Sequence, residues 1–306
     1  MECEKSTIND ITVKTILNEE EREAIVSQLN ALWGSKKPDM FPGPQPISIE
    51  RKHFSEFRKD SYHVGRKTDG ERFALCLMKY KPLHEDTAVN ISFILSRTLQ
   101  IHLIRTKSTK GAHEGTIADC ELIGNTLVMF DCVMASGSNM KSSPFSERLN
   151  ACNSICSFIQ SPDITFEVKT FSMLKSMEQF VKVPCKHKSD GFVFVPEKKG
   201  IMQGTHSTMF KWKPLIQNTI DFGILNGKVY LQNNTNQVTV NVRIDLDDVK
   251  INDDSMTIVE CMYVGEKRWK GLHIRHDKHQ PNGHYTYKKT LINIAEDIQE
   301  SEFYAE

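Results

Sequence analysis

A lysine opens the stretch Lys67-Thr-Asp-Gly-Glu-Arg72, which follows an apolar-rich run and precedes the apolar run 73–78. A lysine amine has a usual pKa of about 10.4, so it attacks as a nucleophile only when it is desolvated or crowded by other cations and a metal. Asp69-Gly70 is typical of a tight turn, in which the glycine can take positive φ. Such a turn would hold Lys67 at a strand end with Arg72 reaching back toward it. A plain hairpin with a solvated lysine is the alternative for this stretch alone.

Further polar and aromatic segments follow Lys67 in a fixed order. They are Ile117-Ala-Asp-Cys-Glu-Leu122, Phe130-Asp131, Ser189-Asp-Gly-Phe-Val193, Phe210-Lys-Trp-Lys213 and Arg275-His-Asp-Lys278. The ordered series resembles the motifs of the covalent nucleotidyltransferases, the superfamily of messenger RNA guanylyltransferases and ATP-dependent polynucleotide ligases. The resemblance is closest to the virus-encoded mRNA capping enzyme guanylyltransferases of the chlorella virus type, and it covers nearly the whole chain.

The resemblance implies a two-step reaction. The Lys67 amine attacks the α-phosphate of GTP and releases pyrophosphate, and the GMP is then transferred to the 5′-diphosphate end of an RNA. Both steps place negative charge on phosphate oxygens in the transition state, so the site needs many fixed cations. The implied catalytic residues are Lys67, Arg72, Lys211, Lys213, Arg275 and Lys278.

The resemblance also implies nucleotide contacts and a metal. The nucleotide-binding residues would be Thr68, Arg97, Glu121, Phe130, Asp190 and Asp277. Phe130 would stack on the purine, because a flat apolar face suits a base. Asp190 and Glu121 would bind the Mg²⁺ or Mn²⁺ that holds the pyrophosphate. Taken singly, these acids are more often turn or strand-end residues, and Phe130 could be a core side chain.

One position departs from the family pattern. Cys120 stands where the family usually has glycine between the aspartate and the glutamate of its third motif. A cysteine requires ordinary φ and adds a side chain, so either the strand is regular here or the ribose pocket is altered. The departure bears on Glu121 and leaves the nucleophile untouched.

Size and composition allow one large or two ordinary cores, since 306 residues contain 39% hydrophobic residues. No apolar run reaches the roughly 18 residues that cross a bilayer, and the N-terminus lacks the apolar stretch of a signal peptide. Lys+Arg and Asp+Glu balance at 39 each, which argues against a protein that coats nucleic acid and predicts a brief RNA contact confined to one end. The scattered cysteines favour buried thiols over disulfides or zinc.

Two helices and a sheet are expected before residue 160. Asn18, Glu21 and Gly34 predict a helix from Glu19 to Trp33. Residues 36–46 are rich in proline and predict an irregular arm. Short β-branched and aromatic runs between residues 62 and 130 predict antiparallel strands, with Gly124-Asn125 as one of the turns. Ser143-Pro144 predicts the start of the second helix.

The second half predicts a further helix at residues 172–182, then a small barrel. Asn226-Gly227 and Asn233-Asn234 mark hairpins among closely spaced short strands. Residues 289–303 read as an amphipathic helix. The expected class is α+β: a nucleotidyltransferase domain with antiparallel sheets over residues 1–222, an OB-fold over 223–286, and a terminal helix over 287–306 that packs back on the first domain.

Arg275 and Lys278 are far along the chain from Lys67. They would meet the β- and γ-phosphates only if the barrel closes over the first domain, which predicts a hinge near Phe222. Asp221 could be a ligand or a structural cap at that junction.

Two alternatives remain open at this point. An ATP-dependent DNA or RNA ligase shares the fold and the lysine adduct, although Asp190-Gly191 and the run from Arg275 to Asn282 resemble capping enzymes more closely. A non-catalytic subunit is the other alternative, but decay would erase the costly polar residues first, and these are all present. We expect a monomer inside the nucleus or cytoplasm of an infected cell, with no membrane contact. RNA triphosphatase and cap methyltransferase steps, where needed, would belong to other polypeptides.

Overall fold

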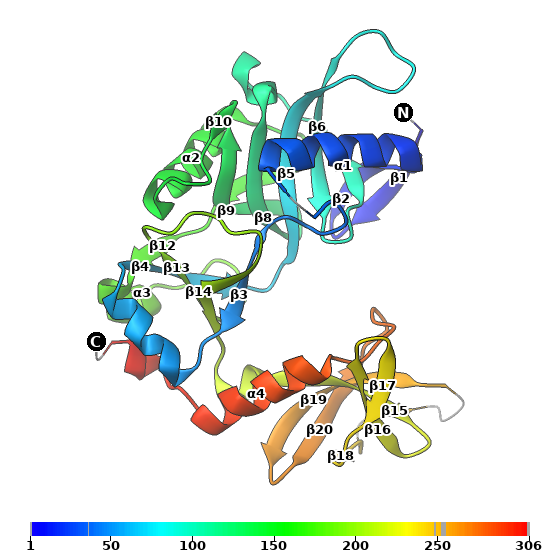
Figure 1. The fold of residues 1–306 in the computed structure, drawn as a ribbon, viewed down its shortest axis with the longest axis vertical. Coiled ribbons are helices and arrows are strands. Elements are labelled where there is room, and N and C mark those ends of the chain that lie inside the picture. The colour runs from blue at the N-terminus through cyan, green and yellow to red at the C-terminus, as the bar shows by residue number, and fades with distance from the viewer. Residues whose placement is uncertain (1, 36, 248, 252–254, 305–306) are drawn as a thin grey trace. The chain divides into compact units, whose positions relative to one another are not determined.

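The computed structural model describes residues 2–35, 37–247, 249–251 and 255–304. Contacts divide the chain into two compact units. Unit 1 comprises Met1–Ile47 and Glu56–Lys211, and unit 2 comprises Ser48–Ser55 and Trp212–Glu306. Figure 1 shows the order of the elements within each unit. In the described part of the chain, no helix has the length and apolar character needed to span a bilayer.

The larger sheet of unit 1 is mostly antiparallel and runs in the order β1-β2-β7-β6-β5-β8-β9-β10, with β11 added in parallel beside β9. Its strands are β1 (Cys3–Ile8), β2 (Ile11–Ile16), β5 (Glu71–Tyr80), β6 (Val89–Ser96), β7 (Ile101–Leu103), β8 (Thr116–Ile123), β9 (Thr126–Ala135), β10 (Ser138–Asn139) and β11 (Thr165–Val168). The predicted turn at Gly124-Asn125 joins β8 to β9, where Ile123 pairs with Thr126. The strands β1 and β2 are absent from the sequence prediction.

This sheet is buried on both faces, which explains the unbroken apolar run in β5. Phe73, Leu75 and Leu77 face one core cluster, which includes side chains of α2 (Phe145–Phe158). The alternate residues of β5 face a second cluster, built with α1 (Glu19–Trp33). Successive side chains of a strand point to opposite faces, so each helix covers one face of the sheet.

Both predicted helices are confirmed. Asn18 Oδ1 accepts a hydrogen bond from the Glu21 amide at 2.9 Å, and Gly34 ends α1 in the left-handed conformation, with φ of 69°. Pro144 precedes the first residue of α2. These are the N-cap, C-cap and N-terminal proline signals that the sequence carries.

The second sheet of unit 1 has five strands in the order β12-β4-β13-β14-β3. Their bounds are β3 (Pro44–Ser48), β4 (Tyr62–Thr68), β12 (Phe171–Met173), β13 (Ser189–Pro196) and β14 (Gly204–Trp212). The irregular arm predicted for residues 36–46 is therefore partly wrong, because Pro44 begins an edge strand. An edge strand tolerates proline, since one side of its backbone needs no ladder hydrogen bonds. Lys36, also in that arm, lies outside the described residues.

The helix predicted for residues 172–182 is shorter than expected. Phe171–Met173 instead forms β12, and α3 spans only Met177–Lys182, after a 3₁₀ turn at Leu174–Ser176. Phe171 pairs with Gly65 of β4, where an added Cβ would lie 2.6 Å from the Phe171 ring. A glycine therefore provides the space in which the aromatic ring packs on the neighbouring strand. The helical spacing of apolar residues in the sequence gives no signal for strand pairing of this kind.

Unit 2 contains a six-stranded sheet in the order β17-β16-β15-β19-β20-β18. Its strands are β15 (Thr219–Leu225), β16 (Lys228–Asn233), β17 (Asn236–Thr239), β18 (Arg243–Asp245), β19 (Thr257–Gly265) and β20 (Arg268–Ile274). Asn226 and Gly227 both take positive φ between β15 and β16, as the predicted hairpin requires. The core of the unit gathers around the fully buried Trp269.

The terminal helix of unit 2, α4, spans His284–Glu296 and is followed by a 3₁₀ turn at Glu300–Phe303. Leu291 and Ile294 pack against the core of the six-stranded sheet. Residues 48–55 are also tied to this end of unit 2, where Asn293 Nδ2 donates to Ile49 O at 2.6 Å and Phe54 stacks on Phe303. The sequence predicted that this helix packs back on a first domain of residues 1–222. Ile49 and Phe54 lie in that range, although residues 48–55 belong to unit 2.

The limits of the units also differ from the predicted boundary at residue 222. Phe222 lies in the middle of β15, is fully buried, and pairs with Val259 of β19. A residue inside a hydrogen-bonded strand pair is poorly placed to act as a hinge. The division between the units falls instead after Lys211.

Candidate functional site

Lys67 is the penultimate residue of β4 and faces Asp190 on the adjacent strand β13. Lys67 Nζ lies 2.9 Å from Asp190 Oδ1, and the two side chains are 25% and 13% exposed. The strands pair in antiparallel register, with a shift between Ser189 and Phe192. Such a bulge re-aims the residues within it, here Asp190 and Gly191. The amine and its carboxylate therefore project from a rigid strand pair.

The chain passes from the second sheet to the first through Asp69-Gly70. Thr68, the last residue of β4, donates a hydrogen bond from Oγ1 to Glu121 Oε2 on β8. Gly70 does not take positive φ as the sequence suggested; an added Cβ would lie 3.0 Å from Leu122 O. The glycine is needed because two backbones approach closely. Thr68, the neighbour of Lys67, is thus joined to Glu121 where the two sheets of unit 1 meet.

Arg72, the second residue of β5, is held by Asp119. Its Nε donates to Asp119 Oδ1 at 2.8 Å, and its Nη2 donates to the other carboxylate oxygen. The guanidinium also lies 5.1 Å from the Phe41 ring centroid and 5.7 Å from that of Phe130. Burial raises the pKa of Asp119 although the Arg72 charge opposes the rise. Gly43 packs against this pair, since a Cβ there would lie 2.6 Å from Arg72 Nη2.

A register shift between β8 and β9 exposes Phe130 to the site. Asp119 pairs with Asp131 and Cys120 pairs with Met129, which leaves Phe130 without a partner in the ladder. Met129 and Cys132 both stay in the core cluster under α2. The extra residue therefore allows Phe130 to leave that core and turn toward Arg72. Phe130 is half-buried, as a ring that accepts a ligand should be.

Lys169 is a site residue that the sequence reasoning missed. It follows β11, and its Nζ lies 2.8 Å from Glu121 Oε2 and 5.1 Å from the Phe130 ring centroid. The side chain is only 7% exposed. A nearly buried lysine is rare unless it is paired, and its location at the predicted stacking ring makes it a candidate site residue. No local motif signals it.

Cys120 lies in a regular part of the strand on its β5 side, where it pairs with Phe73. Its side chain is fully buried in the core cluster under α2, and burial raises the pKa of its thiol well above the usual value. Because Glu121 is the next residue, its side chain points to the opposite face. Of the two alternatives raised by the missing glycine, the regular strand is confirmed.

Asp131, which follows Phe130, serves the structure of unit 1. Its carboxylate accepts hydrogen bonds from Arg148 Nε at 2.7 Å and Nη2 at 3.2 Å. Both side chains are nearly inaccessible to solvent. Arg148 Nη1 also donates to Ser143 O and Lys199 O. This buried pair joins β9 to α2 behind the site.

The sequence also predicted Lys211, Arg97 and Lys213 as site residues. Lys211 is half-buried near the end of β14, the strand beside β13. Arg97 is exposed in the turn after β6. The preceding residue, Ser96, pairs with Phe73 near the start of β5. Lys213 follows β14 and belongs to unit 2.

Three predicted residues of unit 2, Arg275, Asp277 and Lys278, belong to one ion-pair network. Arg275 Nη1 lies 3.1 Å from Asp221 Oδ1 and 3.2 Å from Glu260 Oε2, while its other nitrogens bind the Asp277 carboxylate. Lys278 Nζ donates to the second oxygen of Asp221. The Arg275 charge lowers the pKa of Asp277. Asp221 thus orders the two predicted phosphate-binding cations, which is closer to its structural interpretation than to a ligand role.

No group of three or more His, Cys, Asp or Glu side chains suited to a metal occurs within the described residues. This does not disagree with the predicted Mg²⁺ or Mn²⁺, because Mg²⁺ is commonly bound by one or two carboxylates together with phosphate oxygens and water. Asp190 and Glu121 supply hard oxygen ligands, and each already pairs with a lysine ammonium. The donor set fits such a metal.

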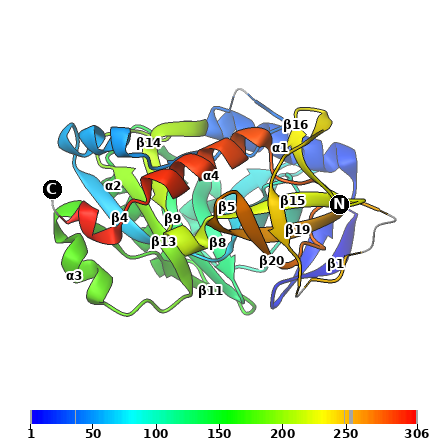
Figure 2. The same ribbon diagram turned by 90° about the horizontal axis from the view of Figure 1, so that it is seen from below.

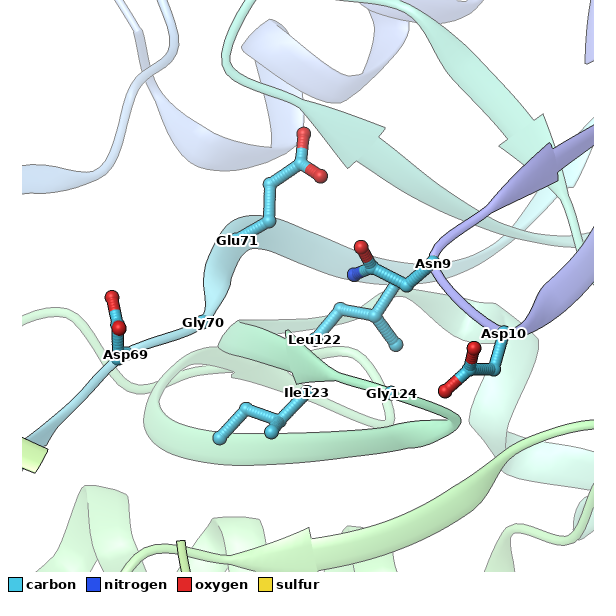
Figure 3. Close-up of a pocket in the computed structure, with 8 residues that line it drawn as sticks. All are labelled: Asn9, Asp10, Asp69, Gly70, Glu71, Leu122, Ile123 and Gly124. Carbon is cyan, nitrogen blue, oxygen red and sulfur yellow. The ribbon is translucent and has the colours of Figure 1, made fainter. Parts of the chain in front are cut away.

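A cavity of about 320 Å³ lies beside the Asp69-Gly70 connection, where it meets the β1–β2 and β8–β9 turns of the larger sheet (Figure 3). Its charged lining is acidic, from Asp10, Asp69 and Glu71. An acidic cavity repels phosphate, so it is distinct from the nucleotide site built around Lys67.

Comparisons with known proteins match both parts of the chain to protein families. The family model described as mRNA capping enzyme, catalytic domain, matches residues 8–215, and the model for the mRNA capping enzyme, C-terminal domain, matches residues 225–304. The mRNA-capping enzyme subunit alpha of Schizosaccharomyces pombe is 23% identical over 366 residues, covering 98% of this chain and 88% of that protein. The subunit of the same name from Yarrowia lipolytica is 25% identical over 324 residues, covering 87% and 82%.

Among solved structures, the ATP-dependent DNA ligase from bacteriophage T7 in complex with ATP is similar with a TM-score of 0.38 and 14% identity, covering 66% of this chain and 80% of the ligase. Both matching family models are capping-enzyme models, which decides between the capping and ligase alternatives. Unit 1 accordingly has the α+β nucleotidyltransferase fold, and the six-stranded sheet of unit 2 is the capping-enzyme OB domain, followed by its terminal helix. The chain therefore belongs to the mRNA capping enzymes and is an mRNA guanylyltransferase of the covalent nucleotidyltransferase superfamily.

Proposed function

We propose that Lys67 is the nucleophile of this guanylyltransferase and that Asp190 positions it. The observation that supports the proposal most strongly is the 2.9 Å pair between Lys67 Nζ and Asp190 Oδ1 at the junction of two sheets. The amine gives up a proton and forms a bond to the α-phosphorus of GTP. The bond from that phosphorus to the bridging oxygen breaks, and pyrophosphate leaves. The RNA 5′-diphosphate then displaces Lys67 from the GMP.

The surrounding residues have separate roles in this proposal. Arg72, oriented by Asp119, supplies a fixed cation for phosphate oxygens, and Lys211 and Lys213 add charge from the end of β14. Phe130 stacks on the base, while Thr68, Glu121 and Arg97 contact the ribose side of the nucleotide. Such preorganised charges stabilise the transition state without reorganising during the reaction.

Lys169 extends the proposal to the choice of base. Its ammonium lies beside the Phe130 ring and can only donate hydrogen bonds. Guanine presents an oxygen acceptor, O6, where adenine presents an amino donor. An amine that reaches the O6 edge of a purine stacked on Phe130 would therefore favour GTP over ATP.

Mg²⁺ or Mn²⁺ would be held by Asp190 and Glu121. When bound, it would neutralise charge on the phosphates and on the leaving pyrophosphate. Asp190 and Glu121 would then bind the metal in place of their lysine partners. The Lys67 amine would in that case lose its ion pair with Asp190.

In unit 2 we propose that Arg275 and Lys278 bind the β- and γ-phosphates during the first step, with Asp277 and Asp221 holding them in place. The Arg275→Ala variant should then lose adduct formation from GTP. Any adduct that it does form should still transfer its GMP to RNA at the wild-type rate. Loss of both steps to the same degree would instead indicate a structural role.

The biological setting is also a proposal. The motif resemblance supports a virus-encoded, monomeric enzyme that works inside the infected cell, in nucleus or cytoplasm. Its partners would be GTP and a 5′-diphosphate RNA end, with the triphosphatase and methyltransferase steps on separate polypeptides. The origin is tested by hybridising the coding sequence to DNA packaged in virus particles and to host DNA. Hybridisation to the packaged DNA supports a viral origin, and hybridisation to host DNA only contradicts it.

Nucleotide labelling tests the function itself. The protein is incubated with α-labelled GTP or ATP and Mg²⁺, then given 5′-diphosphate RNA. We expect alkali-stable, acid-labile label on the protein from GTP only, as a lysine phosphoramidate requires, followed by transfer to RNA and not to a 5′-monophosphate nick. Label from ATP alone would contradict the proposal.

A further inference from the structure

A basic loop, defined here as residues 182–188, runs from the end of α3 to the start of β13 and leads directly to Asp190 (Figure 2). Three of its seven residues are lysines, in a chain whose acidic and basic residues balance. The family motifs do not include this loop, and the reaction chemistry described above does not use it.

The backbone of the loop is fastened to β4 at both ends. Arg66, the neighbour of Lys67, donates from Nη2 to Val181 O at 2.6 Å and to Val183 O at 3.2 Å. Its guanidinium is flanked by Phe180 and Phe192, at 5.6 and 5.1 Å from the ring centroids. At the other end, the Asp69 amide donates to Lys188 O at 3.0 Å. The loop is therefore preorganised beside the nucleophile.

The three lysine side chains of this loop remain in water. The side chains of Lys182, Lys186 and Lys188 are 68%, 70% and 85% exposed. Each is near a carboxylate: Glu178 within α3, Glu167 of β11 and Asp69 after β4, respectively. Exposed ion pairs of this kind contribute about 0–1 kcal/mol. A phosphate chain can therefore displace the carboxylates at little cost. In contrast, the nearly buried Lys169 pairs with a carboxylate inside the site.

The location of the loop identifies the kind of polyanion. Lys188 is followed by Ser189, which pairs with Thr68, and Lys67 precedes Thr68. An RNA whose 5′-diphosphate reaches a GMP on Lys67 brings its next phosphates within reach of this end of β4. We propose, resting on the proposed guanylyl transfer at Lys67, that the basic loop binds the first backbone phosphates downstream of the RNA 5′ end.

This role separates the two steps of the reaction. Adduct formation involves GTP alone and does not need the loop, whereas transfer requires the RNA chain. Because binding to single strands weakens with salt by about 0.7 log units per log unit for each neutralised phosphate, three lysines predict a slope of roughly 2. A short acceptor that ends before these phosphates should not sense the lysines.

The test compares two triple variants with the same change of charge. Lys182→Gln/Lys186→Gln/Lys188→Gln alters the loop, and Lys5→Gln/Lys14→Gln/Lys110→Gln alters exposed lysines on β1, on β2 and before β8. For each variant, GMP transfer from preformed adduct is measured with a 20-nucleotide 5′-diphosphate RNA and with a nucleoside 5′-diphosphate, which has no backbone phosphate, over a range of salt concentrations.

We expect the loop variant to show a KM for the long RNA raised about 10-fold and a salt slope reduced by about 2. Its transfer to the nucleoside 5′-diphosphate should match the wild type, and the control variant should match in every assay. A wild-type KM and slope for the long RNA would overturn the proposal, as would an equal loss with both acceptors. If the wild type formed no adduct at all, the proposed function would fail instead.

Discussion

Lys67 and Asp190 meet at 2.9 Å on adjacent antiparallel strands, although most of unit 1 separates them in the sequence. The bulge in β13 and the close approach at Gly70 set this relationship, and both are properties of the backbone. A nucleophile held by strands keeps its position better than one held by a loop, and small displacements of reacting groups lower rates severely.

Replacing Asp190 by asparagine should therefore reduce the rate of adduct formation by about 100-fold or more, since the amine loses its charged partner and the proposed metal loses a ligand. Single-turnover formation of the adduct from GTP measures the effect. The Glu178→Gln variant, on exposed α3, is the control. A rate within about 3-fold of wild type would remove Asp190 from the mechanism.

Lys169→Met should lower adduct formation from GTP by about 10- to 100-fold, because a hydrogen bond to a charged group contributes about 1.5–3 kcal/mol. The decisive readout is the ratio of rates with GTP and ATP, which should fall. Loss of the Glu121 pair alone would slow both nucleotides equally and leave that ratio unchanged. The exposed Lys175→Met variant on the neighbouring 3₁₀ turn should behave as wild type.

Arg148→Met should destabilise unit 1 by about 3–5 kcal/mol, since it leaves the Asp131 carboxylate buried without its cation. Urea unfolding measures the change. Arg105→Met removes a similar bidentate pair with Asp163, but the Arg105 side chain is 75% exposed, so the expected loss is about 1 kcal/mol or less. Equal effects of the two substitutions would contradict the structural role assigned to Asp131.

Glu197 predicts a pH-dependent contribution to stability. Burial raises the pKa of this carboxyl, but the hydrogen bonds from Ser146 and the charge of His63 lower it by a larger amount. The net shift of the pKa is therefore downward. A lowered folded pKa stabilises the fold above the unfolded value of about 4.3, and this stability is lost as the pH falls through the folded pKa.

Glu197→Gln should therefore cost about 1–2 kcal/mol at pH 7, and the difference from wild type should shrink below about pH 4. Urea unfolding at a series of pH values measures it. A difference that is independent of pH would show that the charge is unimportant. The exposed Glu23→Gln variant on α1 serves as the reference.

The sequence predicted those parts of the site that local chemistry marks. Lys67, Asp190 and Glu121 lie in short motifs that can be recognised from the sequence alone. The caps of α1 can likewise be predicted from Asn18 and Gly34. The hairpins at Gly124-Asn125 and Asn226-Gly227 were predictable because few residues allow such turns.

The rest depends on contacts between distant segments. Lys169 becomes a site residue only because β11 pairs in parallel with β9, beside Phe130. Phe171 forms a strand because Gly65, far along the chain, leaves room for its ring. The placement of α4 in unit 2 depends in the same way on residues 48–55. Tertiary pairing overrides local periodicity at each of these positions.

The central claim is that Lys67 carries the GMP. Intact-mass measurement after incubation with GTP and Mg²⁺, followed by peptide mapping, tests it most directly. The wild type should gain the mass of one GMP on the peptide that contains Lys67, and the Lys67→Ala variant should gain none while Lys188→Ala gains one. A GMP on any other residue, or an adduct that persists in Lys67→Ala, would contradict the account.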